Sequence, residues 1–289
     1  MLGKLRSSLS QLAKQEVLYR YCSYHRFGAA AHSSRYFLSY PVHRGNALNV
    51  VPKRSKRCLF HVTARSEGTQ GNFFDAQFWD STYTSELQPL EWYQSYDELS
   101  PFIKKFITTD SRVLMAGCGN SEFSMHMVKD GFKEIVNIDI SPVVIEAMRK
   151  KYALIPQLKY MRMDATNMSC FENGSFDCVI DKGTLDAIMC VVGGPYNVAM
   201  MLAEITRILK SSGVYMLISF AGPYIVLPLL NTDAFGWSID SYALYRQGPE
   251  DSCNRTCSYP VLLNVNDGHV TSSKQRTDSL FIYICRKLH

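Results

Sequence analysis

One short segment restricts the fold of this chain more than any other: an apolar strand that ends in a glycine turn and leads into a helix. Residues 112–116 form the strand, Gly117 and Gly119 form the turn, and residues 121–130 have a helical pattern that stops at Gly131. Paired glycines permit a tight turn and the close approach of a ligand to the backbone. This order is typical of the first unit of a doubly wound α/β sheet that binds a nucleotide-like ligand.

The rest of the chain continues the alternation of strands and helices. Further strands are predicted at residues 134–140, 158–163, 176–180, 213–220, 236–245 and 280–286. Helices are predicted at residues 96–107, 141–152 and 197–210, and the second of these begins with a serine N-cap and a proline. Such alternation predicts an α/β domain built on a mainly parallel sheet. Residues 247–279 are polar and form a long insertion before the last strand.

Charge divides the chain into a basic leader and a mildly acidic body. Residues 1–70 hold 12 of the 31 Lys and Arg residues and 2 of the 26 acidic residues, so the leader carries +10 and the body −5. Leucines at helical spacing over residues 2–12, with few acids, are typical of an organelle presequence, and the early helix favours a mitochondrion. A plastid presequence, a disordered extension of a cytoplasmic protein and a nucleic-acid-binding arm are alternatives. Cleavage is expected between Arg57 and Gly71.

Composition disfavours several other classes of protein. No apolar run reaches the roughly 18–20 residues that a bilayer-spanning helix needs, so we expect no integral membrane protein. The nine cysteines are scattered, and the closest pair, Cys253 and Cys257, is weak evidence for a metal without a second pair. We therefore expect reduced thiols and no metal site. The acidic body makes a basic protein a better partner than a nucleic acid.

Acidic residues follow three consecutive strands of the predicted sheet. Asp139 lies 20 residues after Gly119, and Asp164 and Asp181 follow the next two strands. The carboxyl ends of parallel strands meet at one edge, where doubly wound sheets bind their ligands. Asp139 suits the two hydroxyls of a ribose. Asp164 suits an adenine amino group, with the backbone N–H of Ala165 donating to the ring.

Two ligands fit a glycine turn followed by such acids. NAD requires a third glycine, so that its pyrophosphate can reach the helix N-terminus, but Glu122 stands at that position. S-adenosylmethionine contains ribose and adenine without phosphate, and its sulfonium and amino groups are positive, so it tolerates neighbouring acids. Glu122, together with Asp164 and Asp181, therefore favours S-adenosylmethionine. An NAD-dependent oxidoreductase is the disfavoured rival.

The sequence resembles the seven-strand S-adenosylmethionine-dependent methyltransferases, most of all the family of elongation factor 1-alpha lysine methyltransferases and methyltransferase-like protein 13, including its plant members. The resemblance rests on VLMAGCGNSEFS, NIDISPVVIEAM, LKYMRMDATNM and SFDCVIDKGTLDAI, preceded by FWDSTY and LEWYQSY. It implies a Rossmann-like sheet of order 3-2-1-4-5-7-6 with an antiparallel last strand. It also implies cofactor contacts from the positions of Trp79, Tyr83, Trp92, Gly117, Asp139, Ile140, Asp164, Ala165 and Lys182.

Aromatic residues and a strand-end acid complete the expected site. Trp79 and Tyr83 lie four residues apart, hence on one helix face, and with Trp92 they suit a lid over a sulfonium. Asp181 ends the fourth strand, where the transferable methyl group is expected, so we nominate it to help a lysine ammonium lose its proton. Lys182 suits a salt bridge to the cofactor carboxylate. An internal network of Asp181, Lys182 and Asp186 is the structural alternative to the substrate role of Asp181.

These features predict a methyltransferase domain over residues 71–289 that modifies a protein lysine. A translation elongation factor or an organellar protein is the expected substrate. Asp-Lys-Gly-Thr at residues 181–184 lacks the Pro-Pro-aromatic run that stacks planar amines, which argues against a nucleobase or glutamine acceptor. A small-molecule methyltransferase and a non-catalytic scaffold with the same fold are the alternatives.

Overall fold

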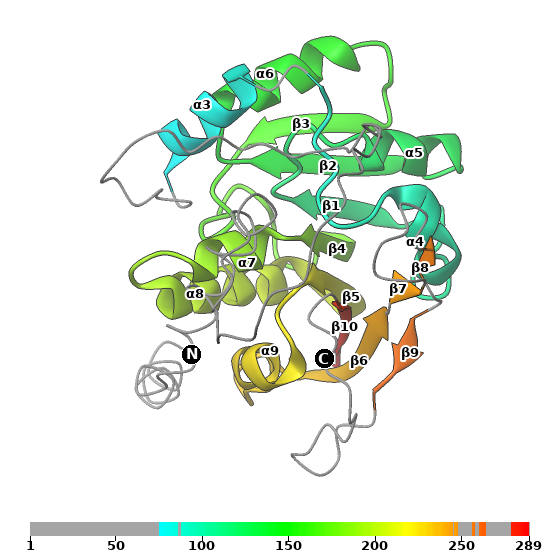
Figure 1. Ribbon diagram of the computed structural model, residues 1–289, viewed down its shortest axis with the longest axis vertical. Helices are drawn as coiled ribbons and strands as arrows, with labels where there is room; N and C mark the ends of the chain where they lie inside the picture. The colour runs from blue at the N-terminus through cyan, green and yellow to red at the C-terminus, as the bar shows by residue number, and fades with distance from the viewer. Residues whose placement is uncertain are drawn as a thin grey trace, which may run out of the picture.

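The computed structural model describes residues 75–85, 88–244, 246–247, 256–257, 260–263 and 279–288. The predicted leader and its cleavage site lie outside these residues, so import into an organelle stays a prediction. Most of the polar insertion at residues 247–279 also lies outside them. Within the described residues, helices cover both faces of one central sheet (Figure 1). Among the helices described, none combines the length and the apolar composition needed to cross a membrane.

Eight strands form the central sheet in the order β3-β2-β1-β4-β5-β10-β6-β9. Their bounds are β1 (Arg112–Ala116), β2 (Glu134–Asp139), β3 (Leu158–Arg162), β4 (Phe176–Lys182), β5 (Leu209–Ser219), β6 (Trp237–Leu244), β9 (Val261–Leu262) and β10 (Leu280–Lys287). Strands β1 to β5 pair in parallel, and β10 is antiparallel to both β5 and β6. Because β10 is the seventh long strand along the chain, the predicted order with an antiparallel last strand is confirmed.

The sheet has one strand more than the seven predicted. The eighth strand, β9, comes from the polar insertion and pairs with β6 through Tyr242–Leu262 and Ala243–Val261. A strand of two residues has no periodicity that sequence reasoning can detect, whereas the outer edge of β6 offers unpaired backbone groups that such a strand satisfies. A separate two-stranded sheet joins β7 (Arg246–Gln247) to β8 (Thr256–Cys257).

Seven described helices surround the sheet. They are α3 (Ala76–Ser85), α4 (Tyr96–Ile103), α5 (Phe123–Lys129), α6 (Pro142–Lys151), α7 (Thr184–Met189), α8 (Gly194–Ile208) and α9 (Pro223–Leu230). The helices predicted from residues 96, 121, 141 and 197 correspond to α4, α5, α6 and α8, with ends shifted by a few residues. Helices α7 and α9 are not among the predicted elements, because they are too short and too apolar to show a helical stripe.

Successive residues of β1 show that the sheet is buried on both faces. Val113 and Met115 belong to the hydrophobic core under α4, α5 and α6, whereas Leu114 and Ala116 belong to the core under α7, α8 and α9. All four side chains are at most 4% exposed. A central parallel strand therefore needs apolar residues at every position, which leaves its carboxyl end as the place where polar chemistry begins.

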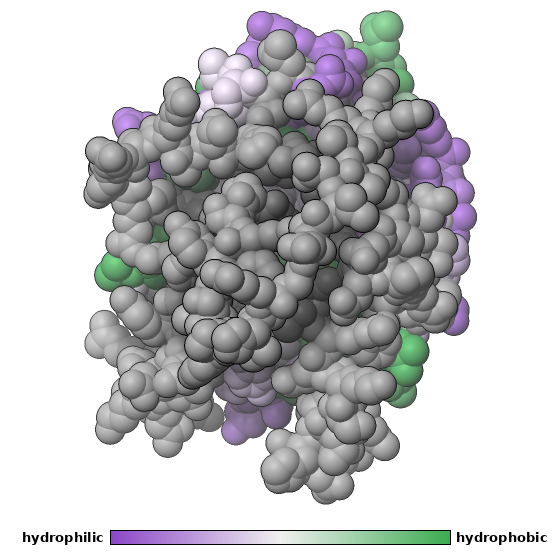
Figure 2. Space-filling model, in the orientation of Figure 1, coloured by the Kyte–Doolittle hydropathy of each residue, from purple (hydrophilic) through white to green (hydrophobic). Residues whose placement is uncertain are grey.

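Helix α3 is fixed at the start of α6. The hydroxyl of Ser141 caps α6 by accepting from the Val144 N–H at 3.2 Å, and it donates to Asp80 Oδ1 of α3 at 2.5 Å. The two helices consequently lie side by side beyond β3 (Figure 1). The outer face of α6 is charged, and the coloured surface at the top of Figure 2, where α6 lies, is mainly hydrophilic. This helix pair brings the aromatic residues of α3 toward the ends of β1 and β2.

Candidate active site

The carboxyl ends of β1, β2 and β4 meet at one edge of the sheet and carry most of the predicted site residues. The glycine turn follows β1, Asp139 ends β2, and Lys182 ends β4. Strand β1 pairs with β2 on one side and with β4 on the other, so these ends are neighbours. Asp164 follows β3, the next strand outward.

The glycine turn requires glycine at both positions. Gly117 and Gly119 have φ angles of +65° and +53°, in the left-handed region that other residues rarely adopt. A Cβ atom on Gly117 would lie 2.0 Å from Thr184 Oγ1, and one on Gly119 would lie 2.7 Å from the Tyr83 hydroxyl oxygen. The side chains that press on the turn therefore come from α7 and α3. The expectation that glycine makes room for a ligand is thus refined, because the protein itself fills the space above both glycines.

Asp139 is the buried acceptor of this edge. Its side chain is 7% exposed, and its carboxylate oxygens accept from the backbone N–H groups of Gly119 at 2.9 Å and Ser141 at 3.0 Å. Burial raises its pKa to about 6, and the bonds from these N–H groups oppose the rise. The Ile140 N–H also bonds to this carboxylate and lowers the pKa. A carboxylate offers about four acceptor directions, so Asp139 retains part of its acceptor capacity for the hydroxyls of a ribose.

The next strand end has a more open acid. Asp164 is partly exposed, and its Oδ1 accepts from the backbone N–H and the hydroxyl of Thr166, both at 2.8 Å. Ala165 is 9% exposed and packs into the core under α7 to α9. Ile140 directly follows Asp139 and is partly buried. One oxygen of Asp164, Oδ1, is therefore used in an Asx turn with Thr166, and the other oxygen is available to a ligand.

Helix α3 places the ring of Tyr83 against the glycine turn and stacks Trp79 on that ring. Trp79 and Tyr83 stack with ring centroids 5.9 Å apart and planes at 23°, as their spacing predicts for one helix face. Burial and the nearby Asp139 carboxylate hold the pKa of the Tyr83 hydroxyl well above its usual value. The hydroxyl of Tyr83 is therefore a neutral donor beside Gly119.

The third aromatic residue, Trp92, lies on a separate segment, residues 88–93. The Asn120 side chain, one residue beyond Gly119, fixes the start of this segment by accepting from Leu90 N–H at 2.8 Å and donating to the Gln88 carbonyl at 3.0 Å. Trp92 is 42% exposed, whereas the residues on either side of it are only partly exposed. This segment crosses from the glycine turn toward the end of β4.

Lys182 and Glu91 form a salt bridge that joins the segment to β4. The Lys182 ammonium also donates to the Trp92 carbonyl at 2.6 Å. The Glu91 carboxylate accepts from the Ser121 hydroxyl at 2.8 and 2.9 Å. The salt bridge from Lys182 to a cofactor carboxylate stays a prediction, and in this structure the partner of Lys182 is Glu91.

Tyr93 is held in a strained conformation at the same strand ends. Its φ angle is +67°, and its ring packs edge-on against Phe220 with centroids 4.3 Å apart. Its hydroxyl donates to Asp186 Oδ2 at 2.5 Å, and Asp186 also accepts from the Ser219 hydroxyl at 2.5 Å. A non-glycine residue at positive φ persists where the surroundings determine its position, which is common at functional sites.

Asp181 does not occupy the place expected for a catalytic acid. It is 0% exposed, and its oxygens accept from the backbone N–H groups of Thr184 and Leu185 and from the Tyr215 hydroxyl at 3.0 Å. Burial, assisted by the nearby Asp186 carboxylate, raises its pKa to about 7. The position at a strand end suggested an exposed acid, but α7 begins immediately and folds over the carboxylate. This placement argues against a direct role for Asp181 on a substrate amine.

Glu122 faces away from the glycine turn. It precedes α5 and forms an ion pair with Lys151 of α6 at 2.8 Å, with both side chains 40% exposed. The bond from Lys151 is the largest cause of the lowered pKa of this carboxyl. The negative charge expected beside a phosphate is therefore largely compensated by a neighbouring lysine, which weakens that argument against NAD.

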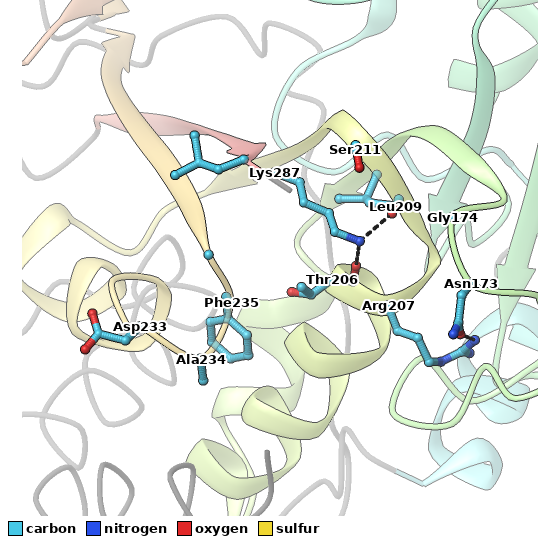
Figure 3. Close-up of a pocket in the computed structure, with 12 residues that line it drawn as sticks. Asn173, Gly174, Thr206, Arg207, Leu209, Ser211, Asp233, Ala234, Phe235 and Lys287 are labelled. Atoms are coloured by element: carbon cyan, nitrogen blue, oxygen red, sulfur yellow. Dashed lines mark hydrogen bonds between the residues drawn. The ribbon is translucent and has the colours of Figure 1, made fainter.

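A cavity of about 580 Å³ opens at the other end of the sheet, between the end of α8, the start of β5 and the end of β10 (Figure 3). Its lining includes Arg207, Phe235 and Lys287. The Lys287 ammonium donates to the carbonyl of Thr206, in the last turn of α8, at 2.8 Å and to that of Leu209, the first residue of β5, at 2.7 Å. The cavity is thus built around a helix C-terminus, remote from the strand ends that carry Asp139 and Lys182.

Several residues of this edge are not among the sequence predictions. They are Glu91, Tyr93, Asn120 and Ser121. Asn120 and Ser121 directly follow the glycine turn, and Glu91 and Tyr93 flank the predicted Trp92, so proximity in sequence was the available signal. The pairing of the two segments depends on contacts 30 or more residues apart, which no local pattern encodes.

Comparison with known proteins gives matches over the same region. Residues 114–217 match the family model described as "Methyltransferase domain". The chain is 32% identical over 173 residues to EEF1A lysine methyltransferase 4 of Mus musculus, covering 56% of this chain and 68% of that protein. It is 36% identical over 183 residues to eEF1A lysine and N-terminal methyltransferase of Homo sapiens, covering 62% of this chain. The chain matches only 24% of the length of the human protein.

A solved structure supports the fold. A structure described as "Conversion of a Disulfide Bond into a Thioacetal Group during Echinomycin Biosynthesis" is 17% identical, covers 74% of this chain and 94% of its own, and has a TM-score of 0.50. This similarity shows the fold, and the sequence matches show the family. The chain belongs to the S-adenosylmethionine-dependent methyltransferases, in the family of the eEF1A lysine methyltransferases, and its cofactor is S-adenosylmethionine.

Proposed function

We propose that this methyltransferase modifies a lysine side chain of a protein. The observation that carries the proposal is its 32% identity to mouse EEF1A lysine methyltransferase 4 over 68% of that protein. The body of the chain, residues 71–289, has a formal charge of −5, which suits a basic protein surface around the lysine. The substrate is a translation elongation factor of the eEF1A type or, if the leader directs import, a protein of the mitochondrion or plastid.

We further propose that the cofactor lies along the carboxyl ends of β3, β2, β1 and β4. Asp164 and Ala165 would hold the adenine, Asp139 with Ile140 the ribose, and Gly117 and Gly119 the methionine end. The desolvated carboxylate of Asp139, which faces backbone N–H donors and retains acceptor capacity, supports the ribose assignment. In this order the sulfonium points toward the end of β4.

The main contribution of the protein to methyl transfer is to align the amine with the methyl group and to exclude water. S-adenosylmethionine supplies an activated methyl group, which leaves sulfur as the new bond to nitrogen forms. The lysine amine must be neutral to attack, so its proton passes to solvent or to a nearby base beforehand. Trp79, Tyr83 and Trp92 would shield the cofactor, and an aromatic face attracts a sulfonium. The buried Asp181 has no direct part in this proposal.

The substrate proposal is tested by proteome-wide mass spectrometry of cells with and without the gene, separated into cytosolic and organellar fractions. We expect at least one methylated lysine to disappear in the deleted cells and to return with the wild-type gene, but not with Asp139→Ala. The fraction that holds the affected protein also tests the proposed mitochondrial location. Unchanged methylation of every detected lysine in the deleted cells would contradict lysine methylation.

Asp139 should make cofactor binding depend on pH. Its carboxyl has a pKa of about 6, so it is charged at about pH 8 and largely protonated at about pH 5. A protonated carboxyl loses acceptor capacity, and we expect the affinity for S-adenosylhomocysteine to fall by up to about tenfold between these values, the limit that a pKa of about 6 sets at about pH 5. Calorimetry on Asp139→Asn should show weak binding with little pH dependence. Equal affinity of the wild type at both pH values would contradict the assignment.

Asp181→Asn should leave methyl transfer almost unchanged and alter the pH dependence of stability. The pKa of Asp181 is about 7 in the folded protein and about 3.9 in an unfolded chain. The folded state therefore binds the proton more tightly, and this residue lowers the free energy of unfolding as the pH rises from about 4 to about 7. Urea unfolding of the variant should show a smaller decrease over that window. A folded variant with a 100-fold slower transfer would restore a catalytic role.

A further inference from the structure

The Lys182 ammonium binds groups of the protein itself. The side chain is 6% exposed, and its nitrogen bonds to the Glu91 carboxylate and the Trp92 carbonyl and lies 5.4 Å from the centre of the Phe123 ring. Burial lowers the pKa of Lys182, and the Glu91 charge opposes that shift. A buried ammonium without a counter-charge is strongly unfavourable, so Glu91 keeps Lys182 charged and in place.

Glu91 connects two parts of the cofactor edge that are otherwise separate. Its Oε1 atom accepts from Lys182 at the end of β4, and both of its carboxylate oxygens lie within hydrogen-bond distance of the Ser121 hydroxyl, two residues after Gly119. The Glu91 side chain is 28% exposed, so solvent screens this pair less than it screens a surface salt bridge. Asn120 adds two further bonds from the same turn to residues 88 and 90. The segment is thus fastened to both strand ends.

Trp92 is held between fixed neighbours. Its carbonyl is bound by Lys182, the preceding residue is Glu91, and the following Tyr93 is anchored on Asp186. The Trp92 side chain is nevertheless 42% exposed at the edge where the cofactor is proposed to lie. A backbone fixed on both sides of an exposed indole is an arrangement that presents the ring to a ligand without an ordering cost on binding.

We infer that Glu91 is a positioning residue of the cofactor site, which acts by holding Lys182 and thereby the backbone of Trp92. The inference rests on the proposed cofactor position at the ends of β1, β2 and β4. It also gives Lys182 a different task from the salt bridge with the cofactor carboxylate that its position suggests. Neither Glu91 nor the Lys182 ammonium needs to touch the cofactor in this arrangement.

Two ligands distinguish the two tasks of Lys182. S-adenosylhomocysteine carries an amino-acid carboxylate, whereas 5′-methylthioadenosine keeps the adenosine and the thioether but lacks that carboxylate. We expect Glu91→Gln and Lys182→Met each to weaken both ligands by a similar factor, about tenfold, because a misplaced binding group affects either ligand. The double variant should be no weaker than the single variants, since both remove the same link. The tryptophan emission, to which Trp92 contributes beside Trp79 and Trp237, should also change in each variant that folds.

The calorimetric result that overturns the inference is specific. If Lys182 binds the cofactor carboxylate directly, Lys182→Met weakens S-adenosylhomocysteine but not 5′-methylthioadenosine, and Glu91→Gln binds both as the wild type does. Glu91→Gln leaves the buried Lys182 ammonium without its counter-charge and can prevent folding for that reason. The double variant removes both charges, and its affinities for the two ligands then distinguish the two tasks of Lys182. Normal binding of both ligands to the double variant also overturns the inference.

Glu134→Gln is the matched control. Glu134 pairs with Arg112 and Lys159 at the start of β2, at the opposite end of the sheet, so the same substitution there should leave binding of both ligands unchanged. These measurements need no methyl acceptor. A failed inference about Glu91 would therefore leave lysine methylation standing, and a wrong acceptor would leave the binding results unaffected.

Discussion

The hydrogen bond from the Gly119 N–H to Asp139 Oδ2, 2.9 Å long, ties together the parts of this methyltransferase on which its chemistry depends. It joins the turn after β1 to the end of β2, so the shape of the turn and the position of the carboxylate are set by one contact. Tyr83 packs over Gly119 on one side of this contact. The bond also lowers the cost of burying a carboxylate in a place where burial raises its pKa to about 6. Because the Asp139 carboxylate is desolvated and still has free acceptor capacity, it offers a binding site for hydroxyl groups.

A second layer of contacts supports this centre from outside the sheet. Asp80 and Ser141 fix α3 on α6, and Glu91 with Lys182 fixes the Trp92 segment on β4. In each of these two pairs, a charged or hydroxyl group at the end of a strand or helix holds an aromatic residue near the glycine turn. The aromatic residues are thus placed by electrostatic contacts, while the two hydrophobic cores fix the strands themselves.

Much of this architecture follows from local sequence patterns and can be predicted from them. Apolar strands buried on both faces, the Ser141-Pro142 helix start and the four-residue spacing of Trp79 and Tyr83 each have a pattern with one structural meaning. The burial of Asp181 was not accessible, because the six residues of α7 that cover it have no amphipathic stripe. The bridge from Glu91 to Lys182 spans 91 positions and depends on how two loops meet. The strand β9 escaped prediction because it is two residues long.

The structure of the protein bound to S-adenosylhomocysteine is the most direct test of this account. We predict that both ribose hydroxyls donate to Asp139, that the thioether lies toward the end of β4, and that Lys182 remains paired with Glu91. Density for the ligand in the cavity beside Lys287, or a ribose that makes no contact with Asp139, would contradict the central claim that the ends of β1 and β2 form the cofactor site.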